Sequence, residues 1–210
     1  MWEYRLFWPS TRPDWWSEVW QHGEQLLRQR GEEVENRPDT YLVISNRPDV
    51  GLKMRGDRNF EVKSLHERAG SWELWEKYPF FRWSALEAAR LANMLRVKPR
   101  LVTTTESAPT KGVAEFLGRL DIETSKVQVR KSRLQATASE LFAEVPGCTA
   151  APFWLAELVE IQLPWRSTSI VSICLETLEP IGKLSDPFVA DGAWRCGYPE
   201  LLARQLAEIS

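Results

Sequence analysis

The sequence predicts an α+β protein: an antiparallel, eight-stranded, tunnel-like β-barrel with helices packed outside it. Most of the chain consists of short segments in which apolar and polar residues alternate, as they do along β-strands. These segments follow one another over short gaps, which is typical of antiparallel neighbours, and the strand–helix–strand rhythm of a parallel sheet is absent. A few longer segments have the 3.6-residue apolar period of helices that cover a sheet.

Alternation defines the predicted strands. In the first strand, Trp2, Tyr4 and Leu6 alternate with other side chains, and Pro9 ends the run. Turn-forming residues separate several of the later segments. The predicted strands are residues 2–8, 40–44, 51–55, 59–65, 101–105, 126–136, 156–163 and 168–176.

Capping residues and apolar periodicity define the predicted helices. Asp14 is the expected N-cap of the first helix, whose apolar face is rich in tryptophan. Ser84 and Glu87 form a capping box for the second helix, and Pro199 occupies the first position of the last one. The predicted helices are residues 14–30, 84–95, 112–120 and 199–209.

The composition indicates one domain spanning residues 1–210, because the 13 prolines are scattered singly and neither a repeat nor a long linker interrupts the chain. The 27 Lys+Arg and 29 Asp+Glu leave a net charge of −2, which argues against a nucleic-acid partner. The longest apolar runs are too short to cross a membrane, and Glu3 and Arg5 interrupt any N-terminal signal segment. The 3 widely spaced cysteines favour a reducing, cytoplasmic location.

Charged residues share one face of several predicted strands. Lys53 and Arg55 alternate with apolar residues, as do Glu61 and Lys63. An ordinary sheet with one face in water shows the same pattern, and this alternative stays open. The other interpretation is a barrel with a charged interior, whose apolar outer face the helices cover. Such an interior must be hydrated, internally paired or filled by an anion, because an unpaired buried charge is strongly unfavourable.

Several short runs of sequence, taken in order, resemble a known family. They are Asp39-Thr40-Tyr41-Leu42, Gly51-Leu52-Lys53-Met54-Arg55-Gly56, Phe60-Glu61-Val62-Lys63, Val129-Arg130-Lys131-Ser132-Arg133, Glu157-Leu158-Val159-Glu160-Ile161-Gln162 and Gly197-Tyr198-Pro199-Glu200-Leu201-Leu202. The series resembles the CYTH superfamily of triphosphate tunnel proteins, which includes thiamine triphosphatases, inorganic triphosphatases and class IV adenylate cyclases. The order of the runs carries this resemblance, which covers roughly residues 2–205.

The resemblance implies a tunnel in which lysine and arginine side chains bind a triphosphate. The substrate-binding residues that it suggests are Arg5, Lys53, Arg55, Lys63, Lys131 and Arg133. In an active member, carboxylates would hold one or two Mg²⁺ or Mn²⁺ ions that activate water or polarise the phosphoryl group. The metal-ligand candidates are Glu3, Glu61, Glu160 and Glu176.

The chain departs from the family pattern in its first strand. The family has E-x-E-x-K there, and this chain has Glu3-Tyr4-Arg5-Leu6-Phe7, so that only the first acidic residue is present. In a later strand, Gln162 replaces another acidic residue. Arg5 is then either a cation among the remaining carboxylates or the partner of an interior glutamate, which would make the tunnel internally neutral.

The leading hypothesis is that the protein binds a triphosphate- or polyphosphate-bearing small molecule and, if it is an active enzyme, hydrolyses that molecule with a divalent metal. Whether it is an enzyme stays open. The first alternative is a catalytically degenerate CYTH-like module that binds an anion or another protein. The second is a barrel that binds an apolar ligand, which the 11 tryptophans suggest.

Trp72, Trp75 and Trp83 form an aromatic group in a segment that is predicted to be rich in loops. Exposed aromatic groups of this kind mark protein interfaces, so this region is the candidate surface for a protein partner. Packing in the core is the favoured alternative, because large aromatic side chains are usually well buried.

Overall fold

The computed structural model describes residues 1–44, 46–55, 59–98, 107–143, 145, 154–178, 188 and 191–209. The strands are β1 (Trp2–Trp8), β2 (Glu35–Val43), β3 (Val50–Arg55), β4 (Asn59–Ala69), β5 (Trp72–Phe80), β6 (Ser125–Thr137), β7 (Leu155–Gln162), β8 (Ile170–Thr177) and β9 (Trp194–Arg195). The helices are α1 (Trp16–Gln29), α2 (Ala85–Met94), α3 (Pro109–Arg119), α4 (Ala138–Phe142) and α5 (Tyr198–Ala207). None of the helices in these ranges is long and apolar enough to cross a membrane. The predicted strand at 101–105 lies outside the described residues.

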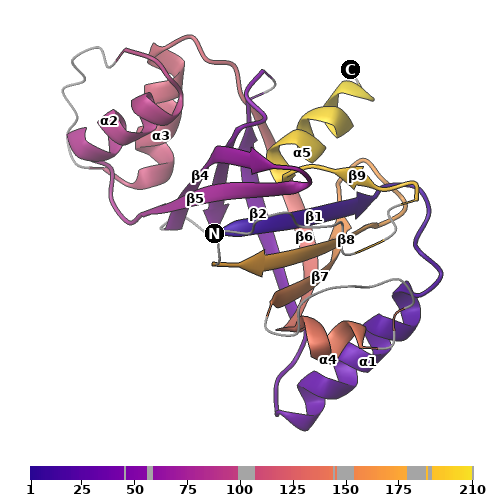
Figure 1. Ribbon diagram of the computed structural model, residues 1–210. Helices are drawn as coiled ribbons and strands as arrows, with labels where there is room; N and C mark the ends of the chain where they lie inside the picture. Colours follow the sequence, from indigo (N-terminus) through magenta and orange to yellow (C-terminus); the bar gives the residue numbers. More distant parts are fainter. Residues whose placement is uncertain are drawn as a thin grey trace. The chain divides into compact units, whose positions relative to one another are not determined.

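The strands form an antiparallel sheet that closes into a barrel (Figure 1). Their hydrogen-bonded order is β5-β4-β3-β2-β6-β7-β8-β1-β9, and β5 also pairs with β1. Along one edge β1 pairs with β8, and along the other it pairs first with β5 and then with β9. Eight strands therefore close the ring, and β9 adds a short ninth strand. The predicted α+β fold, an antiparallel barrel with helices outside, is confirmed.

The strand β5 was not predicted, because its residues do not alternate in the simple apolar–polar manner of an exposed sheet. Trp72 and Trp75 are three positions apart and both are buried. Pairing with β1, which places Trp2 opposite Leu74 and Glu3 opposite Glu73, gives this segment its strand conformation. Such pairing joins residues that are distant in the sequence, so no short window of sequence shows it. The short elements α4 and β9 were missed as well.

Of the four predicted helix starts, that of α2 is correct, and those of α1, α3 and α5 differ by one to three residues: α3 begins at Pro109 and not at residue 112, and Pro199 is the second residue of α5. Ser84 is the N-cap residue of α2, and its side-chain oxygen accepts a hydrogen bond from the backbone N–H of Leu86. The N-cap of α1 is Trp15 and not Asp14, and Trp15 makes no side-chain capping bond. The first helix is thus positioned by its apolar contacts rather than by a cap.

The contacts divide the chain into two compact units. Unit 1 contains Met1–Arg37, His66–Trp75 and Val129–Cys196, and unit 2 contains Pro38–Leu65, Glu76–Gln128 and Gly197–Ser210. The strands β2, β4, β5 and β6 run from one unit into the other. That residues 1–210 form a single domain stays a prediction.

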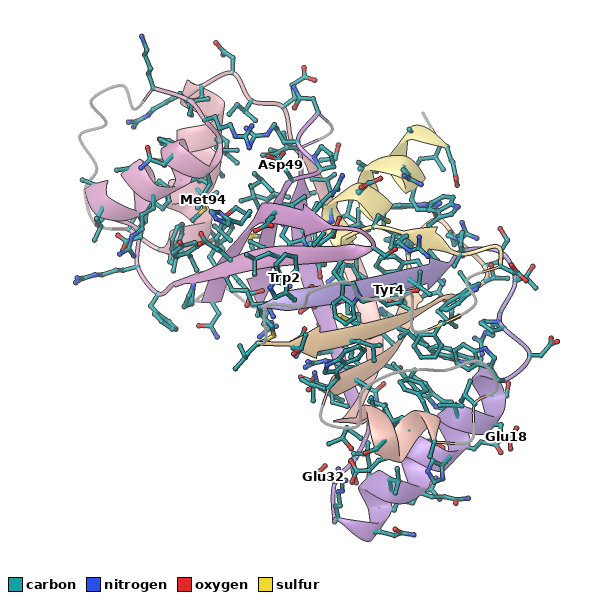
Figure 2. The ribbon with its side chains drawn as sticks, viewed as in Figure 1. Trp2, Tyr4, Glu18, Glu32, Asp49 and Met94 are labelled. Carbon is teal, nitrogen blue, oxygen red and sulfur yellow. The ribbon has the colours of Figure 1, made fainter. Side chains whose placement is uncertain are left out.

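In unit 1, α1 and α4 cover the apolar face of the strands (Figure 1). Tyr4, which is labelled in Figure 2, is fully buried in this core together with Leu6 of the same strand. The helix α1 approaches β6 closely at Gly23, where an added Cβ would overlap the Leu134 side chain. Trp16 and Trp154 also belong to this core. The apolar, tryptophan-rich face under helices is therefore present as predicted.

In unit 2, α2 and α3 pack against one face of β3 and β4, and α5 contacts the other face of β3. Leu52 and Val62 belong to the core formed with α2 and α3. A Cβ on Gly51 would lie 2.9 Å from Pro199 of α5, so α5 packs on the side of β3 that also carries Lys53. This position of the last helix was not predicted.

The aromatic group at Trp72, Trp75 and Trp83 is part of the core. All three side chains are buried, and Trp83 packs against Phe116 of α3 with 5.6 Å between ring centroids. Phe81, in contrast, is 74% exposed. Core packing, the favoured alternative for these tryptophans, is confirmed, and their rings are not available as an exposed patch in this structure.

Candidate functional site

The strands of unit 1 carry charged side chains on the face opposite the helix-covered core. Arg5 of β1 lies opposite Cys174 of β8, which in turn lies opposite Glu157 of β7. Two residues farther along the same pair of strands, Glu3 lies opposite Glu176. Although charged, Glu3, Arg5 and Glu157 are only 4%, 6% and 7% exposed. This face is thus enclosed by protein, as predicted for a barrel with a charged interior.

Glu157 is the centre of an ion-pair network. Arg5 Nη1 donates a hydrogen bond to Glu157 Oε1 at 3.1 Å, and Arg5 Nη2 lies 3.7 Å from Glu3 Oε2. Arg133 donates from Nε to the other carboxylate oxygen of Glu157 and from Nη1 to Glu35 at 3.0 Å. The alternative in which Arg5 pairs with an interior glutamate is therefore confirmed.

The network fixes the charges of its members. Burial raises the pKa of Glu157, but Arg5, Arg133 and Lys131 outweigh it and hold this pKa well below its ordinary value. Burial lowers the pKa of Arg133, and the carboxylates of Glu157 and Glu35 more than compensate. Arg133 therefore keeps its charge, and the buried carboxylate of Glu157 holds it in position.

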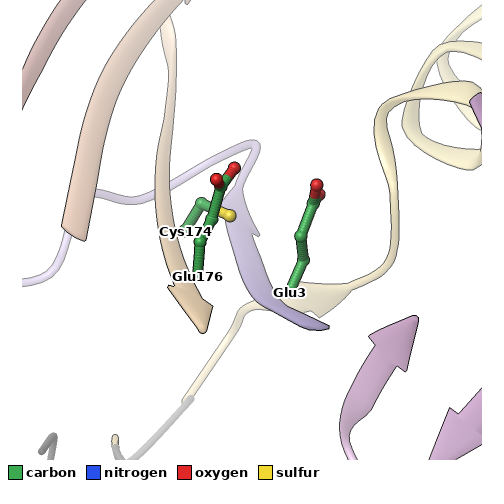
Figure 3. Close-up of side chains that lie close together, drawn as sticks. All are labelled: Glu3, Cys174 and Glu176. Atoms are coloured by element: carbon green, nitrogen blue, oxygen red, sulfur yellow. The ribbon is translucent and has the colours of Figure 1, made fainter. Parts of the chain in front are cut away.

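Glu3, Cys174 and Glu176 form a cluster of side chains that can ligate a metal (Figure 3). One donor atom from each lies within 4.8 Å of the other two. Burial raises the pKa of the Cys174 thiol well above its ordinary value; Arg5 opposes this shift, and the carboxylates of Glu3 and Glu176 add to it. The free side chain is therefore a neutral thiol.

These donors do not fit Mg²⁺ well. Mg²⁺ prefers oxygen ligands in near-ideal octahedral geometry and retains several waters, whereas one of the three donors here is sulfur. Mn²⁺ also favours carboxylate, carbonyl and water ligands. The donor set of this cluster therefore matches the preference of neither ion.

Unit 2 has a second group of paired charges, centred on Asp39 of β2. Lys53 Nζ lies 3.1 Å from Asp39 Oδ2, and Arg55 Nε lies 3.7 Å from Asp39 Oδ1. Asp39 is fully buried. On the neighbouring strand, Glu61 lies opposite Lys53 and Lys63 lies opposite Gly51, so both belong to the same face of the sheet.

The structure brings most of the predicted site residues together within their own unit. In unit 1 these are Glu3, Arg5, Lys131, Arg133 and Glu176, and in unit 2 they are Lys53, Arg55, Glu61 and Lys63.

Glu160 lies elsewhere. It is on the other face of β7 from Glu157, where Arg12 Nη1 lies 2.8 Å from its Oε1. It therefore does not join the cluster of Glu3 and Glu176, as the predicted metal site would require, because the pleat of β7 turns it toward the opposite side.

Two carboxylates that organise these groups were not recognised from sequence, Glu157 and Asp39. Each lies inside one of the sequence runs that resemble the CYTH superfamily, but neither was predicted to be a site residue. The strand β7 is apolar on both faces, since Leu158, Val159 and Ile161 are all buried. Alternation therefore could not show that Glu157 faces the charged interior and Glu160 does not.

Comparison with family models gives no match for this chain, and comparison with curated proteins gives none either. Among solved structures, a candidate adenylate cyclase from Bacillus halodurans aligns at 12% identity, with a TM-score of 0.37, over 84% of this chain and 81% of its own. A candidate adenylyl cyclase from Hippeastrum with a dominant triphosphatase activity aligns at 13% identity and a TM-score of 0.38, over 85% and 80%. A protein from Pyrococcus horikoshii aligns at 11% identity and a TM-score of 0.38, again over 85% and 80%. Similarities this weak carry no argument, and the fold stated above rests on the strand order of the chain itself.

Proposed function

We propose that this protein binds a triphosphate- or polyphosphate-bearing small molecule through the basic side chains on the charged face of its strands. The observation that carries the proposal is that buried carboxylates hold these cations in place: Asp39 holds Lys53 and Arg55, and Glu157 holds Arg5 and Arg133. The CYTH resemblance of the sequence points to the same class of ligand.

Paired cations of this kind are suited to a phosphate ligand. A guanidinium has several N–H donors in a planar fork, so an arginine that pairs with one carboxylate can still bind phosphate oxygens. The side chains of Lys53, Arg133 and Arg55 are 12%, 20% and 42% exposed, so each has contact with solvent. Because they are already positioned, binding an anion orders few additional side chains.

A second candidate function is metal-dependent hydrolysis of the same ligand. One observation favours it: Glu3 and Glu176 face each other across β1 and β8. The sulfur of Cys174 argues against a site of the ordinary Mg²⁺ type. Binding without turnover, as in a catalytically degenerate CYTH-like module, is therefore the function that the geometry supports best.

The test is a thermal-shift titration with tripolyphosphate, with and without Mg²⁺ or Mn²⁺. At 100 times the Kd, a bound ligand adds about 2.7 kcal/mol, which corresponds to about 5 to 11 °C in Tm for a chain of this size. Arg55→Ala/Lys63→Ala leaves the Lys53–Asp39 pair intact and should retain less than half of the shift.

The matched control is Arg28→Ala/Lys111→Ala, which removes the same charge from side chains that are 74% and 73% exposed on helices. This control should respond to tripolyphosphate as the wild type does. Equal shifts in both double variants, or no shift in the wild type, would contradict the proposal. Phosphate release measured in the same samples distinguishes binding from hydrolysis.

A further inference from the structure

The cluster of Glu3, Cys174 and Glu176 has the chemistry of a site for a different metal from Mg²⁺. Carboxylate oxygen together with cysteine sulfur is a donor set that zinc accepts, since Zn²⁺ binds both kinds of ligand. Zn–S and Zn–O bonds of about 2.3 and 2.0 Å at a tetrahedral angle place the donors about 3.5 Å apart. The donors here lie within 4.8 Å of one another, so side-chain adjustments of about 1 Å would complete the geometry.

A second feature of the same face points to a ligand. Ser172 is fully buried, and its Oγ has no hydrogen-bond partner among the described residues. It precedes Cys174 by two positions on β8, so both side chains project from the same face of the strand. A buried hydroxyl without a partner is unusual, and a bound ligand or water on this face of the strand would satisfy it.

The charges of the surroundings balance in the metal-bound form. Glu3, Glu176, Glu157 and the Cys174 thiolate carry four negative charges, and Zn²⁺ together with Arg5 and Arg133 supplies four positive charges. Arg5 also has a second carboxylate partner, because its Nη1 donates to Glu157 at 3.1 Å. Glu3 can therefore turn from Arg5, at 3.7 Å, toward a metal without leaving a buried arginine unpaired.

We propose that Glu3, Cys174 and Glu176 bind one borderline-soft divalent cation, Zn²⁺, in preference to Mg²⁺. Binding forms one metal–sulfur bond and releases the thiol proton to solvent, and the carboxylates contribute oxygen ligands. This site does not depend on the proposed binding of phosphate compounds, and its test uses no phosphate.

The test uses Cd²⁺ as a spectroscopic substitute for Zn²⁺ on the full-length, metal-free protein. A Cys148→Ser/Cys196→Ser background removes the other two cysteines, of which Cys196 is buried and forms no disulfide and Cys148 lies outside the described residues. Titration with Cd²⁺ should produce an ultraviolet thiolate-to-metal charge-transfer band that saturates at one equivalent. Zn²⁺ should abolish the band by competition, and a large excess of Mg²⁺ should not.

Two variants in that background separate the site from adventitious binding. Cys174→Ser should lose the band, and Glu176→Gln should weaken Cd²⁺ and Zn²⁺ binding at least about 10-fold. Loss of a residue that only hydrogen-bonds to a metal ligand already lowers metal affinity by about 10-fold or more, and loss of a ligand itself should cost at least as much. Circular dichroism and the metal-free Tm verify that each variant is folded. A band that persists in Cys174→Ser, an affinity unchanged in Glu176→Gln, or displacement by Mg²⁺ would overturn the proposal. A wild-type Tm that Zn²⁺ does not raise would overturn it as well.

Discussion

Replacement of Glu157 by glutamine tests whether this single carboxylate organises the charged face of unit 1. Glutamine keeps the size of the side chain and removes its charge, so Arg5 and Arg133 lose their common anionic partner. Arg5 is 6% exposed and cannot turn into water without disrupting β1. Glu157→Gln should therefore destabilise the protein and, at the same time, make both guanidinium groups more available to an added anion.

The size of the effect follows from burial. Removing one partner of a buried ion pair costs about 3 to 5 kcal/mol. Arg5 keeps Glu3 and Arg133 keeps Glu35 as carboxylate partners, so the loss for Glu157→Gln should lie at the lower end, about 3 kcal/mol. For a chain of 210 residues, a change of 1 kcal/mol moves Tm by about 2 to 4 °C. Glu157→Gln should therefore lower Tm by about 6 to 12 °C.

The same variant has a defined pH dependence. The folded-state pKa of Glu157 lies below its ordinary value of 4.5, so its contribution to stability is complete above about pH 4.5. This contribution is lost as the pH falls toward the folded-state pKa. The difference in Tm between wild type and Glu157→Gln should therefore be constant near neutral pH and should narrow in acid.

The matched control is Glu160→Gln, a change of the same kind on the same strand. Glu160 pairs with Arg12 in a partly exposed position, where an ion pair contributes about 0 to 1 kcal/mol. Scanning calorimetry of the three proteins at several pH values, with and without tripolyphosphate, gives both readouts. Equal Tm values for the two variants, with equal responses to tripolyphosphate, would refute the role assigned to Glu157.

Two further predictions concern the helices. Gly112→Ala should destabilise the protein by about 1 to 3 kcal/mol, because the added Cβ would overlap the Trp83 ring. Gly118→Ala in the same helix is the control: its Cβ would meet nothing within 4 Å, so this variant should be as stable as the wild type or more stable by up to about 1 kcal/mol. Equal free energies of unfolding in urea for the two variants would contradict this packing. Glu140→Ala should lower the free energy of unfolding by about 0.5 to 2 kcal/mol at neutral pH, because the Glu140 carboxylate caps α4 by accepting hydrogen bonds from the side chain and the backbone N–H of Thr137. The same hydrogen bonds lower the pKa of Glu140 to about 2. That loss should fade between about pH 4.5 and 2, where Glu140 becomes protonated, and a loss that persists below pH 2 would show that the charge is not involved.

The predicted strands correspond well to the observed ones where alternation is clear. β1, for example, spans Trp2–Trp8, as the pattern ending at Pro9 indicates. Alternation also placed Lys53 and Arg55 on one face of β3, and both approach Asp39 there. Local patterns succeed in such segments because the pleat of a strand depends only on the backbone.

Prediction failed where long-range pairing decides the structure. The strand β5 has an irregular pattern, and it is paired with β1, whose residues lie about 70 positions earlier in the sequence. In the same way, Arg5 meets Glu157 only because β1, β8 and β7 are neighbours in a particular register. Shifting that register by one residue would exchange the two faces and bring Glu160 inward instead.

The sequence by itself determined that this protein is built from alternating strands with amphipathic helices, and that several of its strands carry basic side chains on one face. Those properties depend on the period of each element, which a short window of residues contains. Only the tertiary structure decided which carboxylate each cation pairs with, that Cys174 lies with Glu3 and Glu176, and that Glu160 lies apart from them. These contacts join residues that are distant along the chain, and the closure of the barrel and the strand register select them.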